Sequence, residues 1–367
     1  MEAKASLAPP LVPNAVRVRI DKFGFSANNV TYVATASESA MGYSKFFPTG
    51  TTPSTMMVPV WGLATVIESN NSRIQKGVRL YGYFPSASEC DLAVNEVKDV
   101  GDGHFLVSRP QLPSDRYVYS RYEFLAKDFL YSPSTENIMI LFRPLFYTSY
   151  FLHDYIKYNK LFGGDAVIVS SASSKTAFAY ALVAAADSCR VIGITSASNV
   201  DFTKSLGVYE SVISYDDLSF LQSLSGNVVY VDIAGSPTLK KRVIEGLPRT
   251  ASQLAKSIGV GYSHFTGTAI PKPAQPTKSF PPSKNHEIFF AGTWIQKRFQ
   301  EIGEAQSMKG VKAGWDAMVN HVQKWMKLKE YHGVEAVKSL YLDFIGGNVP
   351  AYLGCICDLR DEKTAKL

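Results

Sequence analysis

Hydrophobic and polar positions follow two different patterns along the chain, and the change falls near Arg143. Between Val16 and about Asp128 the apolar residues form short runs separated by Gly, Pro and Asn clusters, namely VRVRI, VTYVA, VPVWGLATVIE, VRLYGYF and HFLVS. Short apolar runs bounded by turn residues are typical of β-strands. The pattern therefore predicts a compact all-β unit for the first part of the chain.

The second pattern begins at FRPLFYTSYFLHDYIKY, which has helical spacing and leads into the strand-like run AVIVS at 166–170. After it come a helix from Thr176, the strand-like RVIGIT, the helical NVDFTKSL, and the strand-like SVISY and NVVYVDIAG. Alternation of strands and helices predicts a doubly wound parallel sheet with helices on both faces.

The chain has 367 residues, which is more than one hydrophobic core usually supports. We expect a β domain at 1–142, an α/β domain at 143–280, and a C-terminal segment at 281–367 whose helices return to both domains. A proline-rich connector at 271–282 joins the second part to the third. The C-terminal segment carries an apolar stripe at helical spacing, which we interpret as core or subunit packing: Val311, Trp315, Met318, Val322 and Trp325.

Composition and charge limit the classes of protein to which the chain can belong. Hydrophobic residues at 46% and charged residues at 19% are typical of an ordered globular protein. The net charge of +6 is spread without a Lys/Arg block, which favours a small anionic ligand over nucleic acid. No run approaches the ~20 apolar residues that cross a membrane, and no signal-peptide pattern opens the sequence. Since the four cysteines lack metal-binding spacing, we expect a zinc-free cytoplasmic enzyme: Cys90, Cys189, Cys355 and Cys357.

The loop SSASSKTA, between AVIVS and the following helix, is the strongest candidate for a binding site. Backbone N–H groups at a helix N-terminus favour a phosphate group. Hydroxyls of Ser171, Ser173, Ser174 and Thr176 and the cation of Lys175 could add to them. The alternative is that Ser174 only caps the helix and Lys175 is a solvated residue. A cation at a helix N-terminus costs ~0.3–1 kcal/mol unless an anion compensates, which favours a functional role.

Several stretches resemble the medium-chain dehydrogenase/reductase superfamily, in its zinc-free quinone-oxidoreductase and enoyl-reductase branch. They are VRVRIDKFGFSANNVTY, VPVWGLATVIES with KGVRLYGYF, RPLFYTSY, VIGITSASNVDFTKSLGVYESVISYDD and VVYVDIAGSPTLKK. Taken together, ANNVTY, MGYSKFFP, YGYFP, FRPLFYTS and SSASSKTA more closely resemble a branch known only as a domain of unknown function. The resemblance implies an N-terminal GroES-like β domain, a Rossmann-type domain with a doubly wound parallel sheet, and a homodimer.

The same resemblance implies roles for single residues. Thr148 corresponds to a threonine near the nicotinamide, and Asp232 and Gly235 correspond to the ribose end of the site. The zinc ligands of other members are missing, which implies zinc independence. The family's glycine-rich loop is replaced by Ser171-x-x-Ser174-x-x-Ala177, with Lys175 at a further glycine position.

The second strand of the α/β domain indicates the cofactor. Folds that prefer NAD place an acidic residue there to bind the ribose 2′-hydroxyl. In RVIGITSASN no acid occurs before Asp201, and Ser196 and Asn199 occupy the turn. An uncharged turn tolerates a 2′-phosphate, so NADPH is the expected cofactor. In the family a lysine would neutralise this phosphate, but Asn199 stands at its position here, which argues against a preference for NADPH.

A reductase also needs a proton donor. The candidates are Tyr32, Tyr43 and Tyr83 in the β domain, and His264 after a strand of the α/β domain. Since the chain has 20 tyrosines, packing is the alternative for each of them. Arg121 and Arg143 could bind a carboxylate or phosphate, or form structural ion pairs.

The sequence therefore favours an NADPH-dependent, zinc-independent reductase of an activated C=C or C=O bond in a small organic substrate. A non-redox lyase, hydrolase or isomerase on the same scaffold is the alternative, because the nucleotide loop has lost its glycines. A non-catalytic binding protein is a third class, which no feature of the sequence specifically favours.

Overall fold

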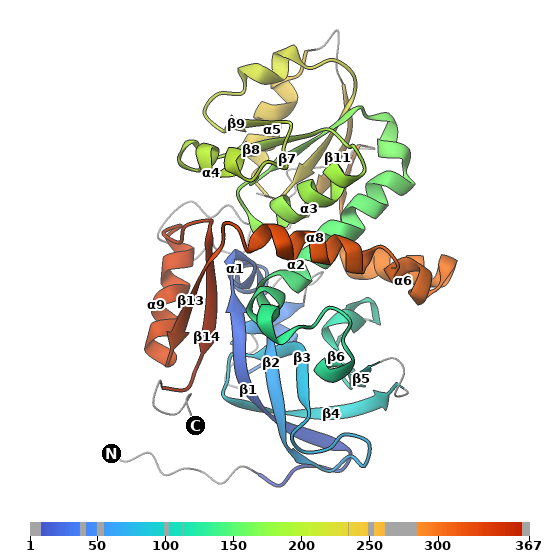
Figure 1. Ribbon diagram of the computed structural model, residues 1–367, viewed down its shortest axis with the longest axis vertical. Coiled ribbons are helices and arrows are strands. Elements are labelled where there is room, and N and C mark those ends of the chain that lie inside the picture. Colours follow the sequence, from blue (N-terminus) through green and yellow to red (C-terminus); the bar gives the residue numbers. More distant parts are fainter. Residues whose placement is uncertain are drawn as a thin grey trace.

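Two β-sheets organise the chain, and helices α2 (Glu136–Tyr158) and α8 (Val311–Val322) run between them (Figure 1). The computed structural model describes residues 9–36, 42–49, 55–98, 103–112, 114–233, 235–248, 253–260 and 285–361. The proline-rich connector predicted at 271–282 lies outside these residues. None of the described helices is both long and apolar enough to cross a membrane.

The first sheet contains the predicted β unit. Its order is β13 (Lys327–His332), β14 (Leu353–Asp358), β1 (Ala15–Phe25), β2 (Pro59–Ser69), β3 (Arg79–Pro85), β6 (Arg121–Phe124), β5 (His104–Val107) and β4 (Glu89–Val97). A further pairing of β1 with β4 closes part of the sheet into a barrel. Its interior is apolar and includes Val18, Phe84 and Phe105. The predicted β-rich first domain is confirmed.

One predicted strand in this part is wrong. The run VTYVA belongs to helix α1 (Ala27–Ala34), which follows β1 directly. The Asn29 side chain accepts the backbone N–H of Ser26 at 2.9 Å, and the Asn29 N–H donates to the Ser26 carbonyl at 2.9 Å. This reciprocal capping starts a helix and overrides the strand propensity of Val and Tyr. The helix brings Tyr32 to the edge of the barrel.

The second sheet is parallel throughout and has the order β12 (His286–Ile288), β11 (Leu254–Gly259), β10 (Val228–Asp232), β7 (Ala166–Ser170), β8 (Val191–Thr195) and β9 (Ser211–Ser214). In β7, Val167 and Val169 face the core that includes α2 and α3 (Lys175–Ala186). Ile168 faces the opposite core, which includes α5 (Pro237–Gly246). The doubly wound sheet is therefore confirmed.

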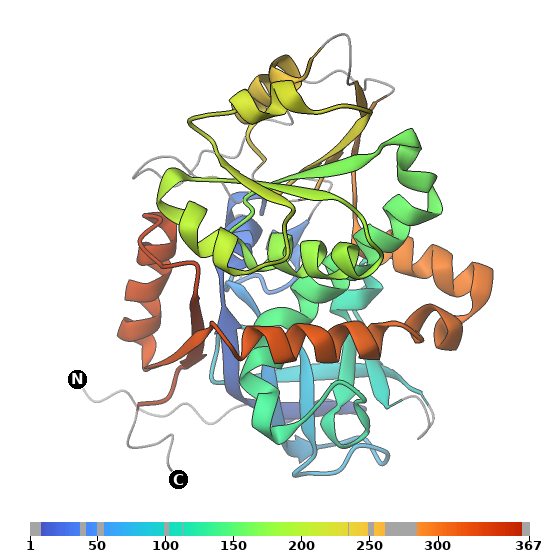
Figure 2. The same ribbon diagram turned by 45° about the horizontal axis from the view of Figure 1, so that its top comes forward.

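The last part of the chain connects the two sheets. Helices α6 (Ala291–Ile302), α7 (Glu304–Met308) and α8 lead from the second sheet back to the first, where α9 (Val334–Ile345) joins β13 to β14 (Figures 1 and 2). Four of the five predicted stripe residues lie on α8 and are buried in the core with α2 and α3, namely Val311, Trp315, Met318 and Val322. The fifth, Trp325, follows the end of α8 and is partly buried against the same core. Helix α4 (Val200–Ser205) follows β8 in the α/β half. The domain boundaries at 142/143 and 280/281 stay a prediction.

Candidate functional site

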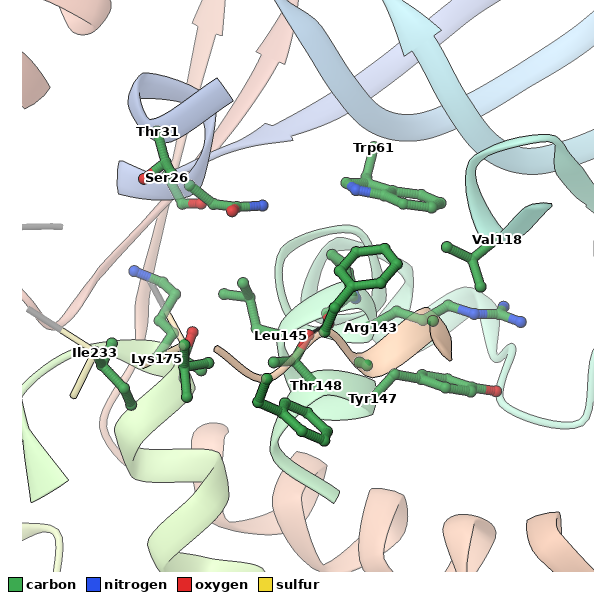
Figure 3. Close-up of a pocket in the computed structure, with 18 of the residues that line it drawn as sticks. Ser26, Thr31, Trp61, Val118, Arg143, Leu145, Tyr147, Thr148, Lys175 and Ile233 are labelled. Carbon is green, nitrogen blue, oxygen red and sulfur yellow. Dashed lines mark hydrogen bonds between the residues drawn. The ribbon is translucent and has the colours of Figure 1, made fainter. Parts of the chain in front are cut away.

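A cleft of about 1560 Å³ lies between the two sheets, at the carboxyl ends of the parallel strands. Ser26, Thr31 and Trp61 line it from the β side, and Thr148, Lys175 and Ile233 face them from the α/β side (Figure 3). Ligands of open α/β sheets bind at the carboxyl ends of the strands. The position of the cleft is therefore that of a nucleotide and substrate site.

The loop SSASSKTA forms one wall of the cleft between β7 and α3. Ser174 caps α3, since its Oγ accepts the N–H of Ala177 at 3.2 Å. The backbone N–H groups of Ser173, Lys175 and Thr176 have no hydrogen-bond partner within the described part of the chain. Three such groups at a helix N-terminus form an anion site. The loop therefore fits a pyrophosphate without glycines.

Ser171 carries the backbone conformation that a glycine would have at this turn. Its φ is 52°, in the left-handed region, and its N–H donates to the Tyr215 hydroxyl at 2.9 Å. The left-handed region costs a non-glycine residue roughly 1–2 kcal/mol. The loop thus keeps a glycine-type turn at an energetic cost. The Ser171 N–H is not available to a ligand, because it is bonded to Tyr215.

Lys175 extends from the start of α3 toward Ser26 on the opposite wall (Figure 3). Its Nζ donates to the Leu353 carbonyl of β14 at 2.9 Å, and no carboxylate pairs with it among the described residues. Burial lowers the pKa of the Lys175 amine to about 8. The alternative of a solvated lysine is therefore wrong, because the partly buried side chain crosses the cleft from the start of α3 to β14.

The turn after β8 is uncharged, as its sequence indicates. Asn199 lines the cleft, and its Nδ2 donates to Ser196 Oγ at 2.9 Å. Ser196 itself does not line the cleft, so of these two residues only Asn199 is placed to contact a ligand. Thr195 donates to Ser173 Oγ at 3.1 Å, which connects this turn to the phosphate loop.

Asp232 and Gly235 lie together at the end of β10, and both line the cleft. Asp232 is buried, and its Oδ1 accepts hydrogen bonds from Ser170 Oγ at 2.9 Å and Gly235 N at 3.0 Å. Burial raises the pKa of this carboxyl group. Beside it, Lys240 Nζ lies 2.8 Å from His286 Nδ1, and both side chains also line the cleft. This lysine–histidine pair was not predicted, because its members are 46 positions apart in the sequence, one on a helix and one on a short edge strand.

Tyr32 lines the cleft from α1. Its hydroxyl oxygen accepts hydrogen bonds from Trp61 Nε1 at 3.1 Å and from Asn28 Nδ2 at 2.7 Å. An indole N–H can only donate, so the phenol oxygen is the acceptor and its own proton stays available. Burial raises the pKa of Tyr32, which keeps the hydroxyl protonated at neutral pH. Trp61 and Asn28 were missed from the sequence, since neither residue type is itself a proton donor to substrates.

The other predicted proton donors differ in position. The hydroxyl of Tyr43 lies 3.0 Å from that of Tyr119, and both residues line the cleft. Tyr83 is completely buried within an aromatic cluster and does not line the cleft. His264 lies outside the described residues. The structure therefore brings Tyr32 and Tyr43 to the cleft and leaves Tyr83 in the core.

The two arginines form ion pairs within the protein. Arg143 pairs with Asp128 and, at 3.4 Å, with Glu123. Arg121 pairs with Glu123 at 2.7 Å and with Glu304 at 2.9 Å. Both arginines line the cleft, but their guanidinium groups are satisfied by carboxylates, so the structural alternative applies.

Thr148 lies on α2 within the cleft, as the resemblance implies, and its Oγ1 donates to the Pro144 carbonyl at 2.9 Å. Its oxygen can still accept a hydrogen bond from a ligand. Across the described ranges no group of three or more His, Cys, Asp or Glu side chains could hold a metal ion.

A family model described as "Protein of unknown function (DUF2855)" matches residues 23–350. The chain belongs to this family. No curated protein matches the sequence. The sequence resemblance to a branch known only as a domain of unknown function is therefore confirmed, and the family description itself names no reaction.

Several solved structures are similar in fold to this DUF2855 protein. CurA from Vibrio vulnificus, solved in complex with NADPH, is 14% identical over 98% of this chain and 94% of that one, with a TM-score of 0.55. A quinone oxidoreductase of Pseudomonas syringae pv. tomato DC3000 is 14% identical over 97% and 95%, with a TM-score of 0.51. Escherichia coli K-12 YhdH, solved with bound NADPH, is 12% identical over 98% and 95%, with a TM-score of 0.50. These similarities confirm the fold of a GroES-like domain followed by a Rossmann-type domain.

The strained turn of the DUF2855 loop gives a test of its geometry. Ser171→Gly should raise the free energy of unfolding by up to about 1 kcal/mol, because glycine adopts the left-handed region without a Cβ penalty. Ser173→Gly is the matched control, because Ser173 has an ordinary negative φ and should lose stability. Urea unfolding of both variants measures the difference. A less stable Ser171→Gly protein would contradict the strained turn.

Proposed function

We propose that this protein is an NADPH-dependent, zinc-independent reductase of an activated C=C or C=O bond in a small organic substrate. One observation carries the proposal. The anion site at the start of α3 and the Tyr32 hydroxyl, whose oxygen already accepts two N–H donors, face the same cleft from opposite walls. A phosphate-binding group and a proton donor on opposite walls are what a dinucleotide-dependent reduction requires.

The cofactor end of the cleft fits the phosphates of a dinucleotide. The free N–H groups of Ser173, Lys175 and Thr176 would hold the pyrophosphate, and the Lys175 ammonium would neutralise part of its charge. Asp232 and Gly235 would contact the ribose of the nicotinamide half, and Thr148 the nicotinamide. NADPH supplies a hydride ion when bound. The NADPH complexes of CurA and YhdH support this choice.

Tyr32 would complete the reduction. Addition of a hydride ion to the β-carbon of a conjugated carbonyl compound moves the double-bond electrons to oxygen, and the resulting enolate must take up a proton. An enolate carbon is a much stronger base than a phenolate, so a phenol with a raised pKa can still protonate it. The N–H groups of Trp61 and Asn28 would then stabilise the Tyr32 phenolate until water protonates it again. A homodimer and a cytoplasmic location stay predictions.

Cofactor binding is the direct test. We expect NADPH to bind more tightly than NADH, because the turn at Asn199 carries no acid that would repel a 2′-phosphate. Titration of the purified protein with each nucleotide, followed by nicotinamide fluorescence with and without a chelator, measures the preference and any need for metal. Equal affinities would contradict the NADPH preference, and loss of nucleotide binding with the chelator would contradict zinc independence.

The non-redox alternative has one observation in its favour, which is that the Lys175 amine already bonds to the Leu353 carbonyl across the cleft, so a phosphate would have to compete with this contact. The same titration separates the two functions. If neither nucleotide binds, the reductase proposal fails and the non-redox alternative is retained.

A further inference from the structure

The amine of Lys175 lies inside the cleft without an anionic partner. Its side chain leaves the first turn of α3 and points toward Ser26 on the opposite wall (Figure 3). Its Nζ donates to the Leu353 carbonyl at 2.9 Å, and no carboxylate in the described part of the chain pairs with it. Lysines are rarely buried unless they are paired with an opposite charge. A lysine that faces a cleft in this way is therefore a candidate for covalent chemistry.

The surroundings of Lys175 make its amine a nucleophile. Burial lowers the pKa of this amine to about 8, so roughly a tenth of it is neutral at pH 7 in the free protein. An unperturbed lysine is neutral in roughly one molecule in 2,500 at this pH. Only the neutral form has the lone pair that attacks a carbonyl carbon, and desolvated lysines form imines with carbonyl compounds. The cleft therefore presents a reactive amine.

Two features of the site would stabilise the product of such an attack. A protonated imine keeps one N–H on its nitrogen, which can still donate to the Leu353 carbonyl. The backbone N–H groups of Ser173, Lys175 and Thr176, which form no hydrogen bond with any described residue, belong to the same turn as the amine. A phosphate bound to them would lie within the length of one lysine side chain from Nζ and would stabilise the positive charge of the imine.

We propose that Lys175 forms an imine with an aldehyde that carries a phosphate group. The Nζ lone pair bonds to the carbonyl carbon, and the carbonyl oxygen takes up a proton, which gives a carbinolamine. The carbon–oxygen bond then breaks, the oxygen leaves as water, and the nitrogen forms the C=N bond. Amine, aldehyde and one proton thus give a protonated imine and water. The proposal shares the anion site of the proposed reductase, needs no nucleotide, and gives the non-redox alternative a defined chemistry.

Pyridoxal 5′-phosphate is the probe, because it is an aldehyde with a phosphate group and its imines absorb visible light. The purified protein is mixed with an equimolar amount of the probe at neutral pH. Borohydride then adds a hydride to the C=N bond, and mass spectrometry of peptides locates the stable secondary amine. We expect the label at Lys175. Pyridoxal, which lacks the phosphate, should need an about tenfold or higher concentration, since charge-assisted hydrogen bonds are lost.

Lys240 provides the matched control. It also lines the cleft, and burial lowers its pKa, but its Nζ lies 2.8 Å from His286 Nδ1 and interacts with Asp232. Lys175→Met should abolish the visible band, whereas Lys240→Met should form the imine like the wild type. Thermal unfolding checks that each variant is folded. Peptide mapping of the wild type decides between the two lysines without any variant.

Three results would overturn the nucleophilic role of Lys175. They are a wild type without the visible band, a label spread evenly over Lys175 and other lysines, and an unchanged band in Lys175→Met. Equal labelling by pyridoxal would overturn the choice of a phosphorylated aldehyde.

Failure of the reductase function has a separate readout, since it would appear as absent NADPH binding in the nucleotide titration. Imine formation at Lys175 in a protein that binds no nucleotide would retain the proposal and reject only the reductase. If both ligands bind, NADPH should protect Lys175 from the label, because the two compete for the same N–H groups. Labelling that NADPH does not reduce would overturn the shared anion site.

Discussion

Replacing Tyr32 with phenylalanine is expected to lower kcat for NADPH-dependent reduction of a conjugated carbonyl compound by about 100-fold or more. The substitution removes the proton donor but keeps the ring that packs against Tyr43 at 4.6 Å. Binding of NADPH should not change, because the phosphate loop lies on the opposite wall of the cleft (Figure 3). Steady-state kinetics, followed by oxidation of NADPH, measure the loss of kcat, and a nucleotide titration measures binding.

Tyr43→Phe is the comparison for this experiment. Tyr43 lies in the same aromatic cluster and lines the cleft, but its hydroxyl is paired with that of Tyr119 at 3.0 Å. Its replacement should cost much less activity than Tyr32→Phe. A larger loss of kcat in Tyr43→Phe would identify Tyr43 as the donor instead. Equal values of kcat for Tyr32→Phe and the wild type would refute the role of Tyr32 as proton donor. They would also refute the proposed role of its two N–H donors.

Replacing Lys175 with methionine is expected to weaken NADPH binding by about tenfold or more at neutral pH, because a charge-assisted contact with the phosphates is lost. The variant should be at least as stable as the wild type. Burial lowers the pKa of Lys175 to about 8, so the folded state disfavours its charged form at neutral pH. Calorimetric titration and thermal unfolding measure the two effects. Unchanged affinity would refute the phosphate contact.

The pKa of Lys175 also predicts how binding depends on pH. The free protein loses the Lys175 proton as the pH rises through about 8, whereas bound phosphates would keep the amine charged. Affinity for NADPH should therefore fall by up to roughly tenfold for each pH unit above that pKa. Burial raises the pKa of the Cys355 thiol, which interacts with Lys175, so the thiol stays protonated where the amine begins to lose its proton. Lys175→Met should abolish the slope, and a slope that persists in the variant belongs to another group.

In the protein without nucleotide, the contribution of Lys175 to the free energy of unfolding also depends on pH. An unfolded lysine has a pKa of about 10.4, so the unfolded chain binds more protons than the folded one between pH 8 and that value. The contribution of Lys175 to the free energy of unfolding therefore rises with pH across this window. Nucleotide affinity falls while this contribution rises, which separates the two effects experimentally.

The sequence predicted most of the fold, because its two hydrophobic patterns reflect local geometry. Short apolar runs such as VRLYGYF form strands of the barrel, and AVIVS forms a strand buried on both faces. The strand predicted where helix α1 lies was wrong, because the start of this helix depends on the reciprocal hydrogen bonds of Ser26 and Asn29. A hydrophobicity pattern does not show such hydrogen bonds. The return of β14 to the first sheet depends on pairing with β1, which no local pattern encodes.

The candidate site was predictable only where chain neighbours form it. The loop around Lys175 is contiguous, so its residue types already indicated an anion site. The hydrogen bonds of Tyr32 join α1 to Trp61 in β2, and Lys240 meets His286 across two elements. Whether an arginine is free depends on its partners, and only the structure shows Arg143 paired with Asp128. The role of these residues in the site therefore depends on contacts between segments that are distant in the sequence, which residue types alone do not predict.

The position of β14 also affects how the protein folds. Phe23 of β1 pairs with Cys357 of β14, so one edge of the first sheet is completed only by residues that are synthesised much later than β1. Contacts of such long sequence separation form slowly, because a long loop must close first. Until β14 arrives, part of β1 presents unpaired backbone groups, and exposed strand edges promote aggregation. A growing chain that stops before Lys327 would therefore need a chaperone, even though its second sheet is already complete.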